Sequence, residues 1–289
     1  MRFWVDGRLV TESEASVGVL DHGFTVGDGV FETFKVVHDP VVGVVPFAMD
    51  RHIARLAASA RAMGLRLPDA DEVRDALLAV CAANPELADG GRLRITYTSG
   101  PGPLGSDRLD QTTTLAVAAS SPTAWPATTS LALSPWPRNE RSPLAGVKST
   151  SYAENVLALA RAKSVGGDEA LLANLAGDVC EGTASNVFLV EDRTLISPPL
   201  STGCLAGITR ALVLQWCAEE GIPVLEETMP VAGLTAVEEV FITSSTRDVH
   251  PVTRILDESG AEIWSEPVGP VTSSVAELFA DRAGRDWNP

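Results

Sequence analysis

The sequence predicts a two-domain protein of mixed α/β (α+β) structure, with a small N-terminal α/β domain over residues 1–120, a linker over 121–130 and a larger C-terminal domain over 131–289. Three observations support this prediction. The length of 289 residues suits one large domain or two modest ones. Segments rich in β-branched residues alternate with segments of helical apolar spacing. The stretch from Ser120 to Ser130 is rich in Ser, Thr and Pro, which is typical of a linker.

The N-terminal half contains both kinds of element. Asp6-Gly7 predicts the turn of a hairpin. Ile53, Leu56 and Ala60 recur at helical spacing, and Gly64 marks the end of that helix. The expected strands are 3–10, 29–37, 92–98 and 113–119, and the expected helices are 50–64 and 71–83.

The C-terminal half continues in the same manner. A helix is expected to begin near Tyr152, shortly after Lys148, and another to stop at Gly221 and Pro223. The expected strands are 130–136, 169–174, 186–191, 194–197 and 240–243, and the expected helices are 152–164 and 207–220.

The charge balance limits the possible partners. Lys plus Arg number 22 and Asp plus Glu number 38, so the net charge is −16. A general attraction to nucleic acid or to an anionic membrane is therefore not expected. No run of 18 apolar residues suggests a membrane span, and residues 1–7 resemble a strand and turn rather than a signal peptide. We expect a cytoplasmic protein that binds any small anionic substrate through a local set of donors.

Cysteine and histidine give no sign of a metal site. The four cysteines form no C-x-x-C pair, and the four histidines are scattered. Free thiols in a reducing compartment are the favoured interpretation. The lysines are more informative, because only Lys35, Lys148 and Lys163 are present. The first is expected to be exposed on a strand and the last to be solvated on a helix.

Five segments could carry chemistry, and each also has an ordinary structural explanation. Lys148 precedes a helix and could be a plain surface charge. The run from Glu181 to Phe188 could present a carboxylate and hydroxyls to a ligand, or form only a tight turn. The run from Leu205 to Arg210 opens a helix whose free amides could bind an anion.

The other two segments could complete an anion site. Thr243 to Arg247 places hydroxyl residues at the end of a strand, although a hydrated loop would look the same. Arg51 and Arg55 lie four residues apart on one helical face. Arg51 could bind a phosphate, and a surface ion pair with Asp50 or Glu72 is the alternative.

The order of these segments resembles the class IV aminotransferase family, the pyridoxal phosphate (PLP) enzymes of fold type IV. The resemblance runs from Asp21-His22-Gly23 through Gly27-Asp28-Gly29-Val30-Phe31-Glu32-Thr33 to about Val252, and is strongest at residues 181–188 and 205–210. It implies an active site in the cleft between the two domains and a homodimer with the active site near its interface.

The resemblance also implies roles for individual residues. Lys148 would be the catalytic residue that bonds to PLP, and Glu181 would pair with the pyridine nitrogen. Tyr152 would lie near the cofactor. The remaining residues expected to bind the cofactor, mostly through its phosphate, are Arg51, Ser185, Asn186, Gly207, Ile208, Thr209 and Ser245 or Thr246.

Within the family, the segment from Trp136 to Lys148 resembles 4-amino-4-deoxychorismate lyases, which release 4-aminobenzoate and pyruvate for folate biosynthesis. A transaminase is the alternative. The strand from Arg92 to Gly100 lacks the tyrosine-isoleucine-arginine-proline pattern of branched-chain aminotransferases. Ser99 replaces an arginine of the D-amino acid aminotransferases, and the histidine that follows there is missing. A binding module without catalysis is a further alternative, against which Lys148 and Glu181 both argue.

Substrate recognition by the lyase would need local cations, because aminodeoxychorismate carries two carboxylates. The candidates are Arg108, Arg138 and Arg141, each of which could equally be a solvated loop charge. Phe31, within the N-terminal motif, is a further candidate to contact substrate. We expect at least one of Arg138→Ala and Arg108→Ala to raise the KM for this substrate.

Overall fold

The computed structural model describes residues 1–108 and 112–289, and the chain divides into two compact units. Unit 1 comprises Met1–Ala124, Val147–Tyr152 and Asp286–Pro289, and unit 2 comprises Trp125–Gly146 and Ala153–Arg285. The first change of unit falls inside the expected linker. The structure differs from the expected 131–289 domain because residues 147–152 and 286–289 belong to unit 1, where they hydrogen bond to strand and helix residues described below.

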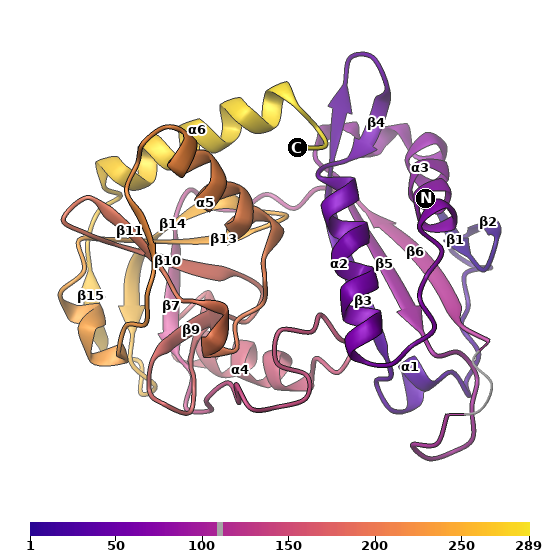
Figure 1. The fold of residues 1–289 in the computed structure, drawn as a ribbon, viewed down its shortest axis with the longest axis horizontal. Coiled ribbons are helices and arrows are strands. Elements are labelled where there is room, and N and C mark those ends of the chain that lie inside the picture. Colours follow the sequence, from indigo (N-terminus) through magenta and orange to yellow (C-terminus); the bar gives the residue numbers. More distant parts are fainter. Residues whose placement is uncertain (109–111) are drawn as a thin grey trace. The chain divides into compact units, whose positions relative to one another are not determined.

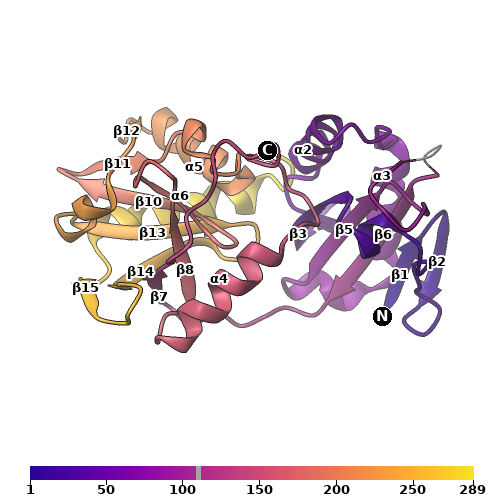
Figure 2. The same cartoon turned by 90° about the horizontal axis from the view of Figure 1, so that it is seen from below.

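Unit 1 contains β1 (Arg2–Val5), β2 (Arg8–Thr11), α1 (His22–Thr25), β3 (Gly29–Asp39), β4 (Gly43–Pro46), α2 (Met49–Ala62), α3 (Ala70–Ala83), η1 (Pro85–Asp89), β5 (Arg92–Thr98) and β6 (Thr114–Ser120). Its strands form an antiparallel sheet in the order β2-β1-β6-β5-β3-β4. Helices α2 and α3 lie on one face of this sheet (Figure 1 and Figure 2) and share one core with it, in which Phe34, Leu56, Leu77 and Leu93 are buried.

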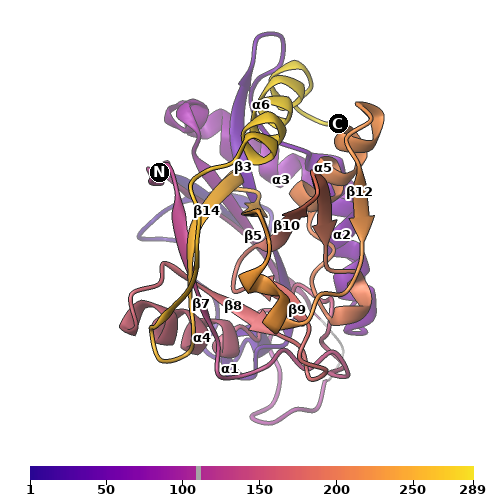
Figure 3. The same ribbon diagram turned by 90° about the vertical axis from the view of Figure 1, so that its left-hand side faces the viewer.

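Unit 2 contains β7 (Thr129–Leu133), α4 (Ala153–Ser164), β8 (Glu169–Ala173), β9 (Val179–Gly182), β10 (Asn186–Glu191), β11 (Thr194–Ser197), η2 (Leu200–Thr202), α5 (Ile208–Glu219), β12 (Val224–Glu226), η3 (Val231–Thr235), β13 (Glu239–Ser244), β14 (Asp248–Leu256), β15 (Glu262–Ser265) and α6 (Pro270–Arg285). Its mixed sheet has the order β12-β11-β10-β13-β14-β7-β8-β9, with β15 paired to β14. Helices α5 and α6 lie side by side next to β13 and β14, and α4 packs on β7 and β8 (Figure 1 and Figure 3).

The four helices expected from apolar spacing are confirmed as α2, α3, α4 and α5. The sequence analysis missed α6, and the structure explains why. The first-turn amides of Val271 and Thr272 donate to the carboxylate of Glu239, at 3.0 and 2.7 Å. Because the cap comes from a residue about thirty positions earlier, the local sequence carries no capping signal.

Two further observations concern the whole of the described chain. None of its helices combines the length and the apolar character that a bilayer crossing requires. Cys81, Cys180, Cys204 and Cys217 are all buried as free thiols. Burial raises the pKa of Cys81 to about 12 and that of Cys217 to about 11, so these thiols are protonated at neutral pH.

Candidate functional site

The main chain around Lys148 is held on strand β3 of unit 1. The amide of Phe31 donates to the carbonyl of Lys148 at 3.0 Å, and the amide of Thr150 donates to the carbonyl of Gly29 at 2.8 Å. Gly27 has φ +71°, and a Cβ added there would lie 2.6 Å from Ser151 Oγ. The glycine motif at 27–29 therefore lets residues 148–151 pass close to β3, although more than a hundred residues separate the two segments.

The Lys148 side chain lies over an aromatic ring. Its Nζ is 4.6 Å from the centroid of the Phe31 ring, and the Arg94 guanidinium carbon is 3.7 Å from the same centroid. Tyr152 meets the Phe31 ring edge to face, with centroids 5.4 Å apart. The structure thus brings together Lys148, Phe31 and Tyr152, all of which the sequence analysis proposed. It adds Arg94, which that analysis missed.

Arg94 lies on the same face of the sheet as Phe31. Thr96 is the register partner of Phe31, and Thr33 is the partner of Arg94, so the strand alternation places all four side chains on one face. Arg94 is exposed as a residue, but desolvation of its guanidinium against the ring lowers its pKa, with a smaller opposing effect from Tyr152. The strand pairing of 29–37 with 92–98 was the signal that could have identified it.

Behind this face, helix α2 supplies a buried ionic cluster. The Glu32 carboxylate accepts hydrogen bonds from Arg55 at 2.7 and 2.6 Å and lies 2.6 Å from His52 Nδ1. Burial acts to raise the pKa of Glu32, but Arg55 and then His52 outweigh it and lower the value to about 2. Burial lowers the pKa of His52 more than Glu32 raises it, so the imidazole is neutral at pH 7. Glu32 therefore fixes Arg55 as a buried cation on α2.

Arg51, the cation expected to bind a phosphate, contacts a different part of the chain. Its Nε donates to the main-chain oxygen of Pro289 at 2.7 Å. Its role toward the cofactor stays a prediction, and Arg55 on the same helix is a second cation for that role.

In unit 2, Glu181 occupies a buried position at the end of β9. Its Oε2 accepts from the amide of Leu205 at 2.9 Å, and its Oε1 lies 3.3 Å from Arg138 Nε. Arg138 Nη2 donates to Asn155 Oδ1 at 3.2 Å, and Asn155 in turn donates to the carbonyl of Thr183. The Glu181 carboxylate is thus ionised and fixed by a main-chain donor and a guanidinium.

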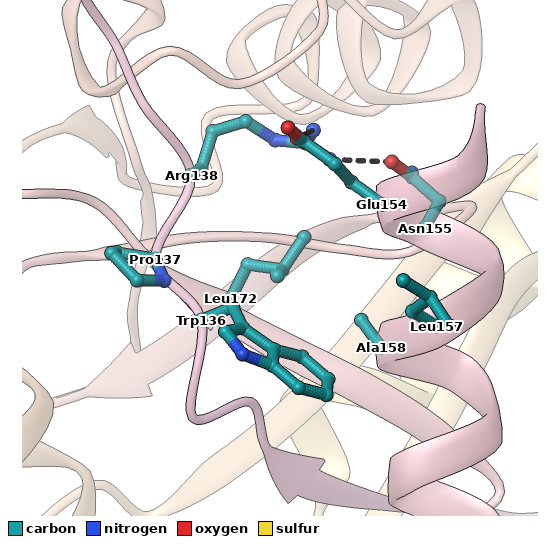
Figure 4. Close-up of a pocket in the computed structure, with 8 residues that line it drawn as sticks. All are labelled: Trp136, Pro137, Arg138, Glu154, Asn155, Leu157, Ala158 and Leu172. Atoms are coloured by element: carbon teal, nitrogen blue, oxygen red, sulfur yellow. Dashed lines mark hydrogen bonds and ion pairs between the residues drawn. The ribbon is translucent and has the colours of Figure 1, made fainter. Parts of the chain in front are cut away.

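Arg138 also forms part of a pocket beside this carboxylate. Figure 4 shows its guanidinium reaching toward Glu154 and Asn155 at the start of α4. The cavity has a volume of about 240 Å³ and is mostly apolar. Its lining residues are Trp136, Pro137, Arg138, Glu154, Asn155, Leu157, Ala158 and Leu172.

The arginines expected to bind substrate therefore have protein partners. Arg138 is bound to Glu181, and Arg108 forms two hydrogen bonds with the Asp28 carboxylate and a third with the carbonyl of Met63. Burial acts to raise the pKa of Asp28, but the hydrogen bond from Arg108 outweighs it and the pKa is lowered. Substrate binding by either arginine would require breaking these contacts. Arg141 is exposed.

The start of α5 forms a cradle suited to an anion. A Cβ on Gly207 would lie 1.9 Å from Asn186 Oδ1, so only glycine fits immediately before Ile208 and Thr209. Asn186 donates to the carbonyl of Leu205 at 2.8 Å and is the strand partner of Thr243. The hydroxyls of Thr243 and Ser244 are buried and have no hydrogen-bond partner within the described residues.

These features fit the phosphate of PLP. Buried hydroxyls without a partner are costly, and helix-terminal amides favour a negative group. The sequence analysis placed the hydroxyls at Ser245 and Thr246, and those two stay predictions. Thr243 and Ser244 are the additional hydroxyls that the structure reveals.

Ser185 contacts a structural carboxylate. Its hydroxyl donates to Glu169 Oε1 at 2.8 Å, as does the amide of Ala184. Arg247 pairs with the other oxygen of Glu169 at 2.7 Å and stacks on Trp125. Glu169 therefore holds the turn that follows Glu181, and contact of Ser185 with the cofactor stays a prediction.

Comparison with known proteins gives a consistent result. The family model described as amino-transferase class IV matches residues 29–255. A Methanocaldococcus jannaschii protein, provisionally named a branched-chain-amino-acid aminotransferase, is 35% identical over 97% of this chain and 96% of its own. The D-alanine aminotransferase of Bacillus licheniformis is 33% identical over 95% and 94%. The aminodeoxychorismate lyase of Bacillus subtilis is 27% identical over 98% of this chain's match and of its own length, rounded from 97% and 96%.

A solved structure extends this similarity to the fold. A branched-chain amino acid aminotransferase from the organism abbreviated T.th., solved with pyridoxamine 5'-phosphate, has a TM-score of 0.89 and 27% identity. The match covers 99% of this chain and 95% of the other. The fold and the cofactor expected from the sequence are both confirmed.

Proposed function

Because the chain belongs to the class IV aminotransferases, which use PLP, we propose that it is a transaminase that moves the amino group of branched-chain aliphatic amino acids to a 2-oxo acid. This replaces the lyase as the favoured activity. The relatives named as aminotransferases are 35% and 33% identical, and the named lyase is 27% identical.

One structural observation carries the proposal. Arg108 and Arg138, the cations set aside for a dicarboxylate, are held by Asp28 and Glu181. Arg94 is the cation that lies on the Phe31 ring together with Lys148. A single guanidinium near the reactive amine suits a substrate that presents one carboxylate beside an apolar side chain.

Each residue then has a defined task. Bound PLP supplies an electron-withdrawing ring. Lys148 Nζ takes and returns the proton at the substrate α-carbon. Glu181 keeps a proton on the ring nitrogen, and its fixed position costs no reorganisation. The amides of Ile208 and Thr209, with the hydroxyls of Thr243 and Ser244, hold the phosphate.

The D-amino acid alternative has less support. Ser99, which stands where those enzymes have an arginine, is buried, and its amide donates to the carbonyl of Asp28 at 3.2 Å. Of the four-residue pattern of branched-chain enzymes, the strand keeps the arginine, as Arg94.

The test is a donor panel with the PLP-loaded enzyme. Leucine, valine, isoleucine and D-alanine are each incubated with 2-oxoglutarate or pyruvate, and the aminated product is measured. We expect transfer from the branched-chain donors, none with Lys148→Ala, and a raised KM with Arg94→Ala. Transfer from D-alanine alone would overturn the substrate class. Pyruvate and 4-aminobenzoate from aminodeoxychorismate, without amine exchange, would restore the lyase.

We also propose that the enzyme is a homodimer. In unit 1, Phe24 and Leu104 are 74% and 83% exposed, and a second copy would cover these apolar side chains. Sedimentation analysis should give twice the mass of the chain, and a Phe24→Asp variant should shift the equilibrium toward monomer.

A further inference from the structure

Residues 286–289 dock onto the first turn of helix α2. The carbonyl of Trp287 accepts from the amide of Ala48 at 2.7 Å, and the Pro289 oxygen accepts from Arg51 Nε at 2.7 Å. Trp287 also packs against the core of unit 1. Four residues thus make both polar and apolar contacts with the start of one helix.

Asn288 makes the most specific of these contacts. Its Oδ1 accepts from the amide of Asp50 at 2.9 Å, and its Nδ2 donates to the Asp50 carboxylate at 2.8 Å. The Asn288 amide is itself held by Asp286 at 2.9 Å. The side chain is therefore fixed in both directions.

Helix α2 needs such a contact because its own sequence provides no cap. The residue at the N-cap position is Ala48, which has no side-chain acceptor and adopts a left-handed conformation with φ 53°. An N-cap side chain ordinarily accepts from the second or third amide of the helix. Asn288 does this for Asp50, the second residue of α2, from a position 238 residues away.

The capped helix carries the groups of unit 1 that surround Lys148. Arg51 and Arg55 are its two cations, and Arg55 is held by the buried Glu32. One turn further, the Ser59 hydroxyl accepts from the amide of Lys148 at 3.4 Å. A change in the first turn of α2 would therefore alter the placement of the arginines available for the cofactor phosphate.

We propose that residues 286–289 are a positioning device for cofactor binding, and that Asn288 is the residue through which they act. The segment caps α2 and restrains the Arg51 side chain through its Nε. The inference depends on the PLP site and not on which amino acid is the substrate, so the donor panel can fail without affecting it.

The test compares Asn288→Ala with Asn288→Ser in the full chain. Serine is about as good an N-cap acceptor as asparagine, whereas alanine offers none. Loss of one cap predicts roughly 3- to 30-fold faster amide exchange at residues 49–52. We expect the Kd for PLP, measured by equilibrium dialysis, to rise about threefold or more with alanine and to stay close to wild type with serine.

Arg285→Ala is the matched control. Arg285 immediately precedes the segment and pairs only with Asp281 among the contacts described, on an exposed face. Deletion of residues 286–289 should give a larger loss of PLP affinity than Asn288→Ala. Faster exchange with an unchanged Kd would show that the segment caps the helix without positioning the site. Unchanged exchange in Asn288→Ala would overturn the capping itself.

Discussion

The two units hold their functional residues in different ways. In unit 1 the main chain of Lys148 is fixed on β3, but its Nζ rests on the face of Phe31 beside Arg94. In unit 2 the Glu181 carboxylate itself is fixed, by the amide of Leu205 and by Arg138. An aromatic face attracts a cation without fixing its direction, whereas hydrogen bonds fix both.

The difference matches the two tasks. A group that transfers a proton and bonds to a cofactor must move over several ångströms, and a stacked ammonium can do so at little cost. A group that stabilises charge works best when it is already in place. Each of the following variants removes one kind of support, so together they test whether this contrast is real.

Lys148→Ala should have the largest effect. It removes the proton-transfer group, which alone contributes roughly 10²–10⁴-fold to a rate, together with the covalent link to PLP. We expect no measurable transamination by a variant that remains folded. Borohydride reduction followed by peptide mapping should label Lys148 in the wild type. Labelling of Lys35 or Lys163 would show that the reactive amine lies elsewhere.

Glu181→Gln should come next. The amide can still accept from Leu205, so the geometry is retained while the charge is lost. Removal of one preorganised electrostatic contact predicts a fall in kcat of roughly 10²- to 10³-fold, with PLP affinity little changed. Steady-state kinetics with saturating PLP would check this. An unchanged kcat would mean that Glu181 does not act on the ring nitrogen.

Much of this arrangement could be predicted from sequence, where the signals are local. Apolar spacing identified α2 to α5, and the order of motifs identified Lys148, Glu181 and the start of α5. Contacts between distant residues could not be read in that way. Glu239 caps α6 and Asn288 caps α2 from far along the chain, and Arg94 reaches Lys148 only through strand register. For the same reason, Arg138 was taken for a substrate ligand although it binds Glu181.

The third prediction concerns the stability of unit 1. Glu32 has a pKa of about 2 instead of 4.5, so its ion pair with Arg55 stabilises the fold fully above pH 4.5. This contribution is lost as the pH falls from 4.5 to 2, by about 3 kcal/mol in the free energy of unfolding. Glu32→Gln should lower stability at pH 7 by a similar amount and flatten the acid dependence.

Asp50→Asn is the matched control for Glu32. Asp50 pairs with Arg74 on the surface, where 56% of its side chain is exposed. Exposed pairs contribute about 0–1 kcal/mol, so its effect on thermal unfolding should be small. Equal effects of the two variants would contradict the assignment of Glu32 as a buried structural anchor.

Arg138→Ala should have the smallest effect and distinguishes two roles most sharply. As a substrate ligand, Arg138 would affect KM. As the neighbour of Glu181 at 3.3 Å, it should instead affect kcat, because Glu181 would lose a charged contact and could shift from its fixed position. The side chain is 18% exposed, so we expect a fall in kcat of about tenfold, at the lower end for a hydrogen bond to a charged group. Arg94→Ala provides the reverse pattern, since its guanidinium lies beside Lys148 and should act mainly on KM. If both variants changed KM alone, Glu181 would need no support from Arg138, and the contrast between a fixed acid and a mobile amine would fail.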